Sequence, residues 1–290
     1  MTAKTIVLTT AALVGFASNS LLCRAALSDG AIDAASFTLV RLASGAVVLA
    51  VLARSWRRAA DGASDGSWTA AAALFGYAIA FSLAYLRLDA GAGALILFGC
   101  VQLTMFAWGL RRGERLRPVQ WIGFFAAVGG LVALNLPGLK APDPIGALLM
   151  ASAGVAWGVY SLLGRGCQRP LAATASNFAR GVPFALAAAG AAMTFSRPHA
   201  ELRGLVLAAT SGALASGVGY SLWYAALREL SATRAAIVQL SVPVLTASGA
   251  ALVLGEPPSA RTVGAGATIL AGVALALAFR AQAVPRQTLE

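Results

Sequence analysis

The segment Phe16-Ala-Ser-Asn-Ser-Leu-Leu-Cys-Arg24 recurs 141 residues further along the chain as Trp157-Gly-Val-Tyr-Ser-Leu-Leu-Gly-Arg165. At an offset of 142, Gly113-Glu114 likewise corresponds to Gly255-Glu256. Any single match is weak in a chain rich in leucine and alanine, but a nearly constant offset over tens of residues predicts an internal duplication. We expect the first copy to span residues 1–138 and the second copy to span residues 139–290.

The composition is typical of a membrane protein. Of the 290 residues, 59% are hydrophobic and only 11% are charged, whereas a soluble domain carries about 25% charged residues. The same values exclude intrinsic disorder, which requires low hydrophobicity and many charges. The 31 glycines fit a helical membrane protein, because small residues let helices approach closely in a bilayer.

Ten apolar runs are each about long enough to cross a bilayer, which takes roughly 20 residues in a helix. Membrane strands would alternate polar and apolar residues, but runs such as 267–279 are apolar on both alternations. We therefore predict an all-α integral membrane protein with ten transmembrane helices, at about residues 5–23, 33–53, 68–86, 90–110, 119–137, 144–164, 171–195, 204–227, 232–254 and 262–279.

Each predicted copy contains five spans, which is an odd number, so the second copy must enter the membrane from the opposite side. Many secondary transporters are built from such inverted repeats, with a binding site between the two halves near the middle of the bilayer. The sequence therefore predicts two inverted five-helix repeats that give alternating access to a central site.

The basic residues predict the orientation. If both termini are cytoplasmic, 13 of the 22 Lys and Arg residues lie in inner segments and six in outer loops. The excess of basic residues on one side is the usual mark of cytoplasmic loops. We predict a multi-pass protein of the bacterial inner membrane with both termini in the cytoplasm. The net charge of +11 is then explained by membrane orientation, and we expect no nucleic-acid partner.

The order of the spans, the duplicated units and the ends Leu254-Gly255-Glu256 and Arg112-Gly113-Glu114 resemble the EamA-type carriers of the drug/metabolite transporter superfamily. Within that family the chain is most similar to the YddG-type aromatic amino-acid exporters. The resemblance implies that the first, third, fourth, sixth, eighth and ninth helices enclose a central pathway. One departure is that Val101-Gln102 stands where the second half has Val242-Pro243-Val244, so the fourth and ninth spans need not bend alike.

Aromatic and polar residues inside the spans are candidates for lining this pathway. Residues three or four apart share a helical face, as Tyr77 and Phe81 do. Aromatic rings suit a flat apolar group, and ordinary helix packing is the alternative role for each residue. With the helices that the resemblance implies, the expected substrate-binding residues are Asn19, Tyr77, Phe81, Phe98, Gln102, Trp157, Tyr160, Ser161, Tyr220, Trp223, Tyr224 and Gln239.

The charged residues predict structural or gating roles instead. None of the 11 acidic residues lies at mid-depth in a predicted span, so we expect neither a metal site nor a midplane carboxylate that relays protons. Glu114 and Glu256, at span ends, are expected to bind backbone donors or to pair with Arg117 or Arg261. For Arg41 and Arg180, which lie inside spans, we expect bonds to helix carbonyls or snorkelling, with binding of a substrate carboxylate as the alternative.

The predicted function is export of small amphipathic metabolites, above all aromatic or other neutral amino acids, by a monomer that needs no cofactor. Its partners are then a small-molecule substrate and membrane lipid. The sequence contains no His-Glu-x-x-His or phosphate-binding loop and no catalytic constellation within a span, so we do not expect an enzyme. A nucleotide-sugar carrier, another drug/metabolite carrier and a proton-coupled exporter stay open as alternatives.

Overall fold

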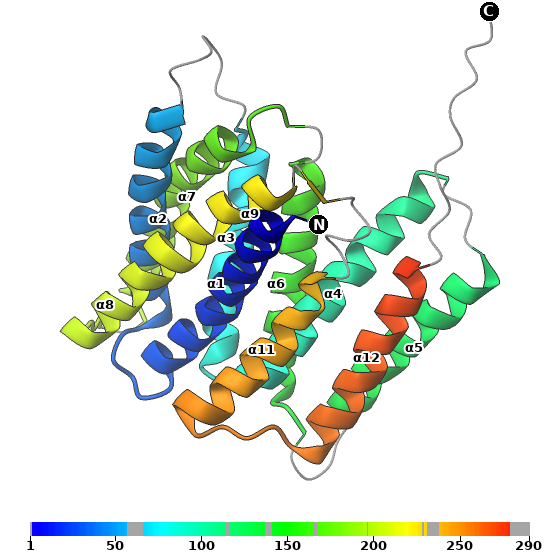
Figure 1. The fold of residues 1–290 in the computed structure, drawn as a ribbon. Coiled ribbons are helices and arrows are strands. Elements are labelled where there is room, and N and C mark those ends of the chain that lie inside the picture. The colour runs from blue at the N-terminus through cyan, green and yellow to red at the C-terminus, as the bar shows by residue number, and fades with distance from the viewer. Residues whose placement is uncertain are drawn as a thin grey trace, which may run out of the picture.

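The computed structural model describes residues 2–56, 66–113, 117–136, 141–164, 167–195, 197–227, 229–230 and 238–278. This part of the chain forms ten helical segments and no strand; Ile32 and Ala200 form an isolated bridge. The helices lie side by side in one bundle, with α5 and α12 at one edge and α2, α7 and α8 at the other (Figure 1). An all-α membrane fold was predicted, and the helical architecture is confirmed.

The helices follow the predicted apolar runs to within a few residues at most ends. The eighth and ninth segments each contain a π-helical stretch, η2 and η3. The observed elements are α1 (Ala3–Leu27), α2 (Ala34–Trp56), α3 (Trp68–Tyr85), α4 (Ala90–Arg111), α5 (Pro118–Asn135), α6 (Pro144–Leu163), α7 (Pro170–Ala192), α8 (Leu202–Thr210) with η2 (Ser211–Val218) and α9 (Gly219–Leu227), α11 (Ser241–Gly249) with η3 (Ala250–Leu254), and α12 (Ala260–Ala278).

Local sequence determines where several helices begin. Pro118, Pro144 and Pro170 open α5, α6 and α7, because a proline in the first turn costs no helical hydrogen bond and already has a helical φ. The side chains of Ser67 and Asp143 accept hydrogen bonds from amides in the first turns of α3 and α6. These caps satisfy backbone donors that would otherwise have no partner.

The outer surface of the bundle is apolar. In the described part of the chain, seven helices are long and apolar enough to cross a bilayer. Large apolar side chains point outward, among them Val7, Leu148 and Leu252, which are 66%, 72% and 86% exposed. Since such a surface is unfavourable in water, it suits contact with lipid chains.

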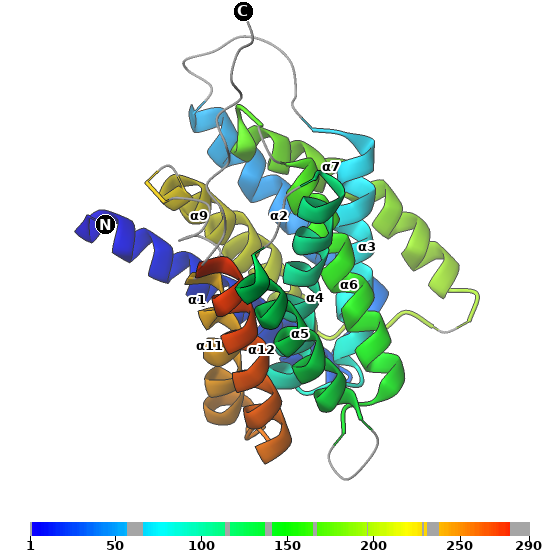
Figure 2. The same cartoon turned by 90° about the vertical axis from the view of Figure 1, so that its right-hand side faces the viewer.

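Helices from the two halves of the chain pack against each other. α2 packs on α7, α5 on α12, and α3 on α6; Figure 2 shows the pairing of α5 and α12 from a second side. The helices α5 and α12 meet at glycines: a Cβ on Gly123 would lie 2.5 Å from the carbonyl oxygen of Gly272. Only residues without a side chain allow two membrane helices to approach this closely.

The fourth and ninth spans differ in shape, as the departure in sequence allowed. α4 is one continuous helix from Ala90 to Arg111. In the ninth span, α11 carries Pro243 in its first turn and passes into the π-helical η3, which Gly255 ends with a φ of 68°. Glycine adopts this left-handed conformation without steric cost, and the following Glu256 is thereby turned out of the helix.

Candidate functional site

A cavity of about 370 Å³ lies within the bundle. This volume falls in the range of sites for small molecules, roughly 300–1,000 Å³. All twelve residues predicted to bind substrate line the cavity. They come from α1, α3, α4, α6, α9 and the residues just before α11, so the structure brings together side chains from both halves of the chain.

The core of the cavity wall is aromatic. The rings of Trp157 and Tyr220 stack at a centroid distance of 5.5 Å and an interplanar angle of 20°. Trp157 also contacts Tyr77 at 4.9 Å and Tyr160 at 5.4 Å. Three helices, α3, α6 and α9, thus bring their rings to one place. Such a wall can hold a flat apolar group through stacked or edge-to-face contacts.

Polar groups are interleaved with these rings. Asn19 donates from Nδ2 to the hydroxyl oxygen of Tyr77 at 3.2 Å, and its Oδ1 accepts a hydrogen bond from Ser211 Oγ at 2.5 Å. On the other side of the cavity, the hydroxyl groups of Thr174 and Tyr224 lie 2.9 Å apart. These neutral groups can bind the polar ends of a small molecule without a full charge.

Sequence reasoning missed several residues of the wall. The cavity is also lined by Phe16 and Ser20 on α1 and by Thr174 and Asn177 on α7. The signal for α7 was present, since Thr174 and Asn177 are polar residues three apart in a predicted span and so share a helical face. They were passed over because the resemblance assigned the pathway to six helices, and the seventh was not among them.

Charged side chains are missing from the cavity lining in the described part of the chain. Among its described lining residues there is no Asp, Glu, Lys, Arg or His. Arg180 donates to Ser176 Oγ at 2.6 Å and lies 5.9 Å from the ring centroid of Trp68. This arginine therefore lies between α7 and the start of α3, apart from the cavity lining.

Arg41 was expected to bond helix carbonyls or to snorkel, and that expectation is wrong. Its side chain is buried, with a residue exposure of 1%. In the described structure its hydrogen bond goes to the hydroxyl oxygen of Tyr77, at 3.0 Å. The side chain packs against α3, where the ring centroid of Phe81 lies 5.2 Å from the guanidinium carbon. This packing holds Arg41 inside the bundle.

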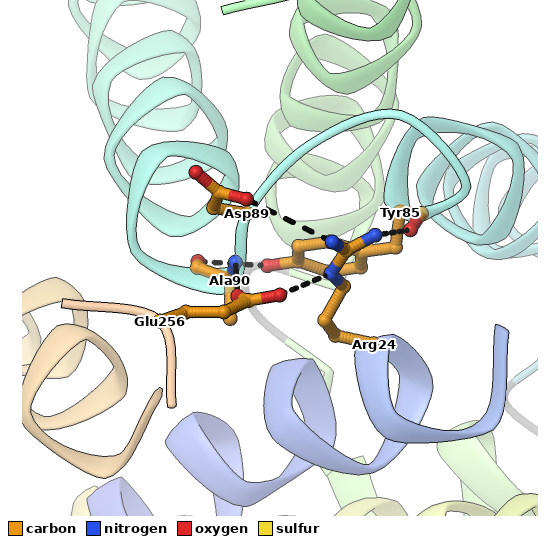
Figure 3. Close-up of polar contacts among 5 residues, drawn as sticks. All are labelled: Arg24, Tyr85, Asp89, Ala90 and Glu256. Atoms are coloured by element: carbon orange, nitrogen blue, oxygen red, sulfur yellow. Dashed lines mark hydrogen bonds and ion pairs between the residues drawn. The ribbon is translucent and has the colours of Figure 1, made fainter. Parts of the chain in front are cut away.

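Glu256 joins three segments at the end of the molecule where α3 ends and α4 begins, here called the α3–α4 end (Figure 3). It accepts hydrogen bonds from Arg24 Nε at 2.6 Å and from the Ala90 amide at 2.9 Å. Arg24 in turn donates to the Tyr85 carbonyl at 2.9 Å and lies 3.7 Å from an oxygen of Asp89. We call Arg24, Tyr85, Asp89, Ala90 and Glu256 the Arg24 cluster.

Of the two alternatives predicted for Glu256, the structure has the backbone contact and not the ion pair with Arg261. Arg261 donates to the Leu136 carbonyl instead, and Arg24 takes its place beside Glu256. The reason is tertiary, since the end of α1 lies next to Glu256 although the two residues are far apart in sequence. Glu114, the predicted counterpart of Glu256, lies outside the described residues.

The two ends of the bundle differ. The cavity reaches Phe106, Gly164 and Pro170, which lie where α4 and α6 end and where α7 begins; we call this the α4–α5 end. At the opposite end, the cavity lining contains no member of the Arg24 cluster. The cavity thus extends towards the α4–α5 end, and the Arg24 cluster lies outside its lining at the other end.

Comparison with known proteins agrees with this architecture. Residues 144–278 match the EamA-like transporter family. Over 281 residues the chain is 54% identical to an uncharacterized protein of Pseudomonas aeruginosa, and the match covers 96% of each chain. The chain belongs to the EamA-like transporter family. An EamA-like protein of this kind is a multi-pass membrane protein of the drug/metabolite transporter class, and catalytic activity is not characteristic of the family.

Two further relatives are similar over most of this EamA-like chain. An uncharacterized transporter of Archaeoglobus fulgidus is 29% identical over 242 residues. The match covers 78% of this chain and 82% of the archaeal protein. A solved structure, titled only as the crystal structure of a protein, has a TM-score of 0.67 at 19% identity and covers 97% of this chain and 99% of its own. At that identity the structural likeness establishes the fold alone.

Proposed function

We propose that this EamA-like protein is a secondary transporter that exports small amphipathic metabolites, above all aromatic or other bulky neutral amino acids. The observation that carries the proposal is the cavity wall, in which Trp157 stacks on Tyr220 and contacts Tyr77 beside neutral hydroxyl and amide groups. A flat ring fits against the aromatic wall, and the polar groups of the substrate find hydrogen-bond partners. The twelve lining residues named above are the proposed binding residues.

We further propose that the two halves, residues 1–138 and 139–290, are inverted repeats that rock around the cavity. If the first five helical segments correspond in order to the last five, the packing pairs obey a twofold pattern. The contact of α3 with α6 then corresponds to that of α9 with α1, and the contact of α4 with α6 to that of α11 with α1. The pairs α2–α7 and α5–α12 map onto themselves. This pattern supports the inverted-repeat construction of many carriers.

The Arg24 cluster is the proposed closed gate of the present conformation. Its contacts join α1, α3, α4 and the segment after η3, and these must separate before the cavity can open at the α3–α4 end. We propose that both termini lie in the cytoplasm of a bacterial cell with the protein in its inner membrane, which the excess of basic residues supports; the α4–α5 end then faces inward. The conformation is then the one that receives a substrate for export.

The proposed driving force is the substrate gradient. Carriers that use protons commonly have a carboxylate or histidine within the membrane, and the described cavity wall has neither. A nucleotide sugar would favour basic residues in the wall, which are missing from the same lining. These two observations favour the amino-acid carrier over both alternatives.

The test is counterflow in proteoliposomes that contain the purified protein. Vesicles loaded with unlabelled L-phenylalanine should accumulate labelled L-phenylalanine transiently, in saturable fashion, and equally with or without a pH gradient. Nucleotide sugars should not compete. Failure of every aromatic and neutral amino acid to exchange would contradict the proposed substrate, and strict dependence on a proton gradient would contradict the proposed coupling. Light scattering of the same sample should show a monomer.

A further inference from the structure

Arg41 is a buried cation with no acidic partner among the described residues. It lies within the candidate membrane span Ala34–Ala53, and 1% of its surface is exposed. The ion pairs found in the described residues belong to Arg24, Arg87 and Arg203. Two of the Arg41 nitrogen atoms, Nε and Nη1, are buried with no hydrogen-bond acceptor in the same part of the chain. The guanidinium group therefore carries an uncompensated positive charge into the bundle.

This arrangement is costly. An arginine stays protonated in proteins, and a charge within the membrane is expensive unless it is paired. The rings of Tyr77 and Phe81 lie 5.1 and 5.2 Å from the guanidinium carbon. Such cation–π contacts stabilise a desolvated cation only partly, and removing an ion from water costs more than they return. Packing alone therefore does not account for the residue.

The charge lies directly behind the cavity wall. Tyr77 and Phe81 both line the cavity and separate it from Arg41. The hydroxyl oxygen of Tyr77 accepts hydrogen bonds from Arg41 Nη2 at 3.0 Å and from Asn19 Nδ2 at 3.2 Å. A phenolic oxygen that accepts two hydrogen bonds keeps its own proton to donate. The Tyr77 hydroxyl can therefore serve as a hydrogen-bond donor to an acceptor held in the cavity.

We propose that Arg41, acting through Tyr77, makes the cavity selective for substrates that carry a carboxylate and against organic cations of the same size. The inference rests on the proposed function and specifies its substrate class. A fixed positive charge behind a low-dielectric wall attracts an anionic group in the cavity and repels a cationic one, and it needs no rearrangement to do so. Arg41 is thus a positioning residue that sets the charge preference without touching the substrate.

Ligands with one ring and different charges provide the test. We would measure the affinities of 3-phenylpropionate (anion), L-phenylalanine (zwitterion), 3-phenylpropanamide (neutral) and 2-phenylethylamine (cation) from ligand-induced shifts in thermal unfolding of the detergent-solubilised protein. The wild type should bind the anion and the zwitterion at least about tenfold more tightly than the cation. In Arg41→Gln the difference in affinity between the anion and the cation should disappear, while the affinity for the neutral amide should change little. Arg41→Lys, which keeps the charge, should preserve the preference.

Arg180→Gln is the matched control, because Arg180 is an arginine within the long helix α7 that is not part of the cavity lining; it should leave the ratio unchanged. If Arg41→Gln does not fold, the ratio of anion to cation affinity in the wild type still tests the proposed charge preference. Tyr77→Phe then provides a second variant, which should reduce this ratio. A wild type that binds the cation as well as the anion would overturn the proposal, and so would an Arg41→Gln variant that weakens all four ligands equally. If the folded wild type binds none of the four, the proposed function itself fails, and this inference fails with it.

Discussion

Arg24 Nε donates to Glu256 Oε1 at 2.6 Å, which ties the end of α1 to the segment that follows η3. Both side chains are only 17% exposed, so this ion pair is shielded from water more than a surface pair. It joins the two halves of the chain at the α3–α4 end, opposite the end that the cavity reaches. A contact in this position is suited to hold one conformation of a carrier closed.

Loss of the Arg24–Glu256 pair should favour opening at the α3–α4 end. Glu256→Gln keeps an acceptor for the Ala90 amide but loses the charge that holds Arg24. Removing one partner of a charged hydrogen bond costs about 1.5–3 kcal/mol, enough to change a two-state population by tenfold or more. We expect labelling of a cysteine introduced at Ala92, in a variant lacking the native cysteines, to rise about tenfold in rate. Glu256→Asp, which keeps the charge, should raise the labelling rate less than Glu256→Gln does; unchanged labelling in Glu256→Gln would argue against a gate.

Trp157 should contribute most to binding an aromatic substrate, because its ring contacts those of Tyr77, Tyr160 and Tyr220. Trp157→Ala removes a stacking surface worth about 0.5–1.5 kcal/mol in addition to its buried area. We expect a loss of at least tenfold in affinity for L-phenylalanine, measured by counterflow at varied concentration, and a much smaller loss for Trp157→Phe. Trp108→Ala serves as the control, since Trp108 is 39% exposed and does not line the cavity. Equal effects of the two alanine variants would contradict the proposed wall.

Gly212 should tolerate no side chain. A Cβ at this position would overlap the carbonyl oxygen of Arg41 and the hydroxyl group of Ser44, and the backbone oxygen has little room to move. Gly212→Ala should therefore separate η2 from α2 and lower the free energy of unfolding by about 1–3 kcal/mol, with a lower midpoint in thermal unfolding. Gly129→Ala, where a Cβ would meet nothing within 4 Å, should leave the midpoint unchanged or raise it slightly. If Gly129→Ala proved less stable than Gly212→Ala, the close contact between α2 and η2 would be contradicted.

Asp33 should stabilise the start of α2 in a pH-dependent way. Burial acts to raise the pKa of Asp33, but hydrogen bonds from the Ser36 side chain and backbone and from the His199 and Ala35 amides outweigh it and lower the pKa below its ordinary value of 3.8. A carboxylate whose pKa is lowered by folding contributes stability above the unfolded pKa and loses it as the pH falls through the folded pKa. Asp33→Ala should therefore cost about 1 kcal/mol at neutral pH and progressively less as the pH falls below the ordinary pKa of 3.8.

The measurement is thermal unfolding of wild type and Asp33→Ala across this pH range. Glu201→Ala is the control, because Glu201 occupies the N-cap position of α8 without a side-chain cap hydrogen bond. It should change stability little at any pH. A difference between wild type and Asp33→Ala that stays constant down to the lowest pH would rule out the linkage.

The location of the helices and much of the cavity wall could be predicted from the sequence. Apolar length and the spacing of aromatic residues are local properties. They place Tyr77 and Phe81 on one face of α3 without knowledge of any contact. The same spacing groups Tyr220, Trp223 and Tyr224 on α9, and all five side chains line the cavity.

Other residues of the wall needed more than spacing. The places of Gln102 and Gln239 followed from the family resemblance, which implied that the fourth and ninth spans border the pathway. Thr174 and Asn177 on α7 were missed, because polar residues in a predicted span do not show by themselves whether their face is turned towards a cavity or towards a neighbouring helix. That direction depends on how α7 is rotated against the rest of the bundle.

What the sequence determined by itself is therefore the set of apolar helices, because the bilayer requires each span to satisfy its own backbone hydrogen bonds and to present apolar side chains. Only the tertiary structure decided which side chains meet. Arg24 and Glu256 are 232 positions apart, and Arg41 on α2 reaches Tyr77 on α3. Partners of this kind depend on the angles and close approaches of whole helices, which no local pattern encodes, so the gate and the buried charge became visible only when the helices were packed.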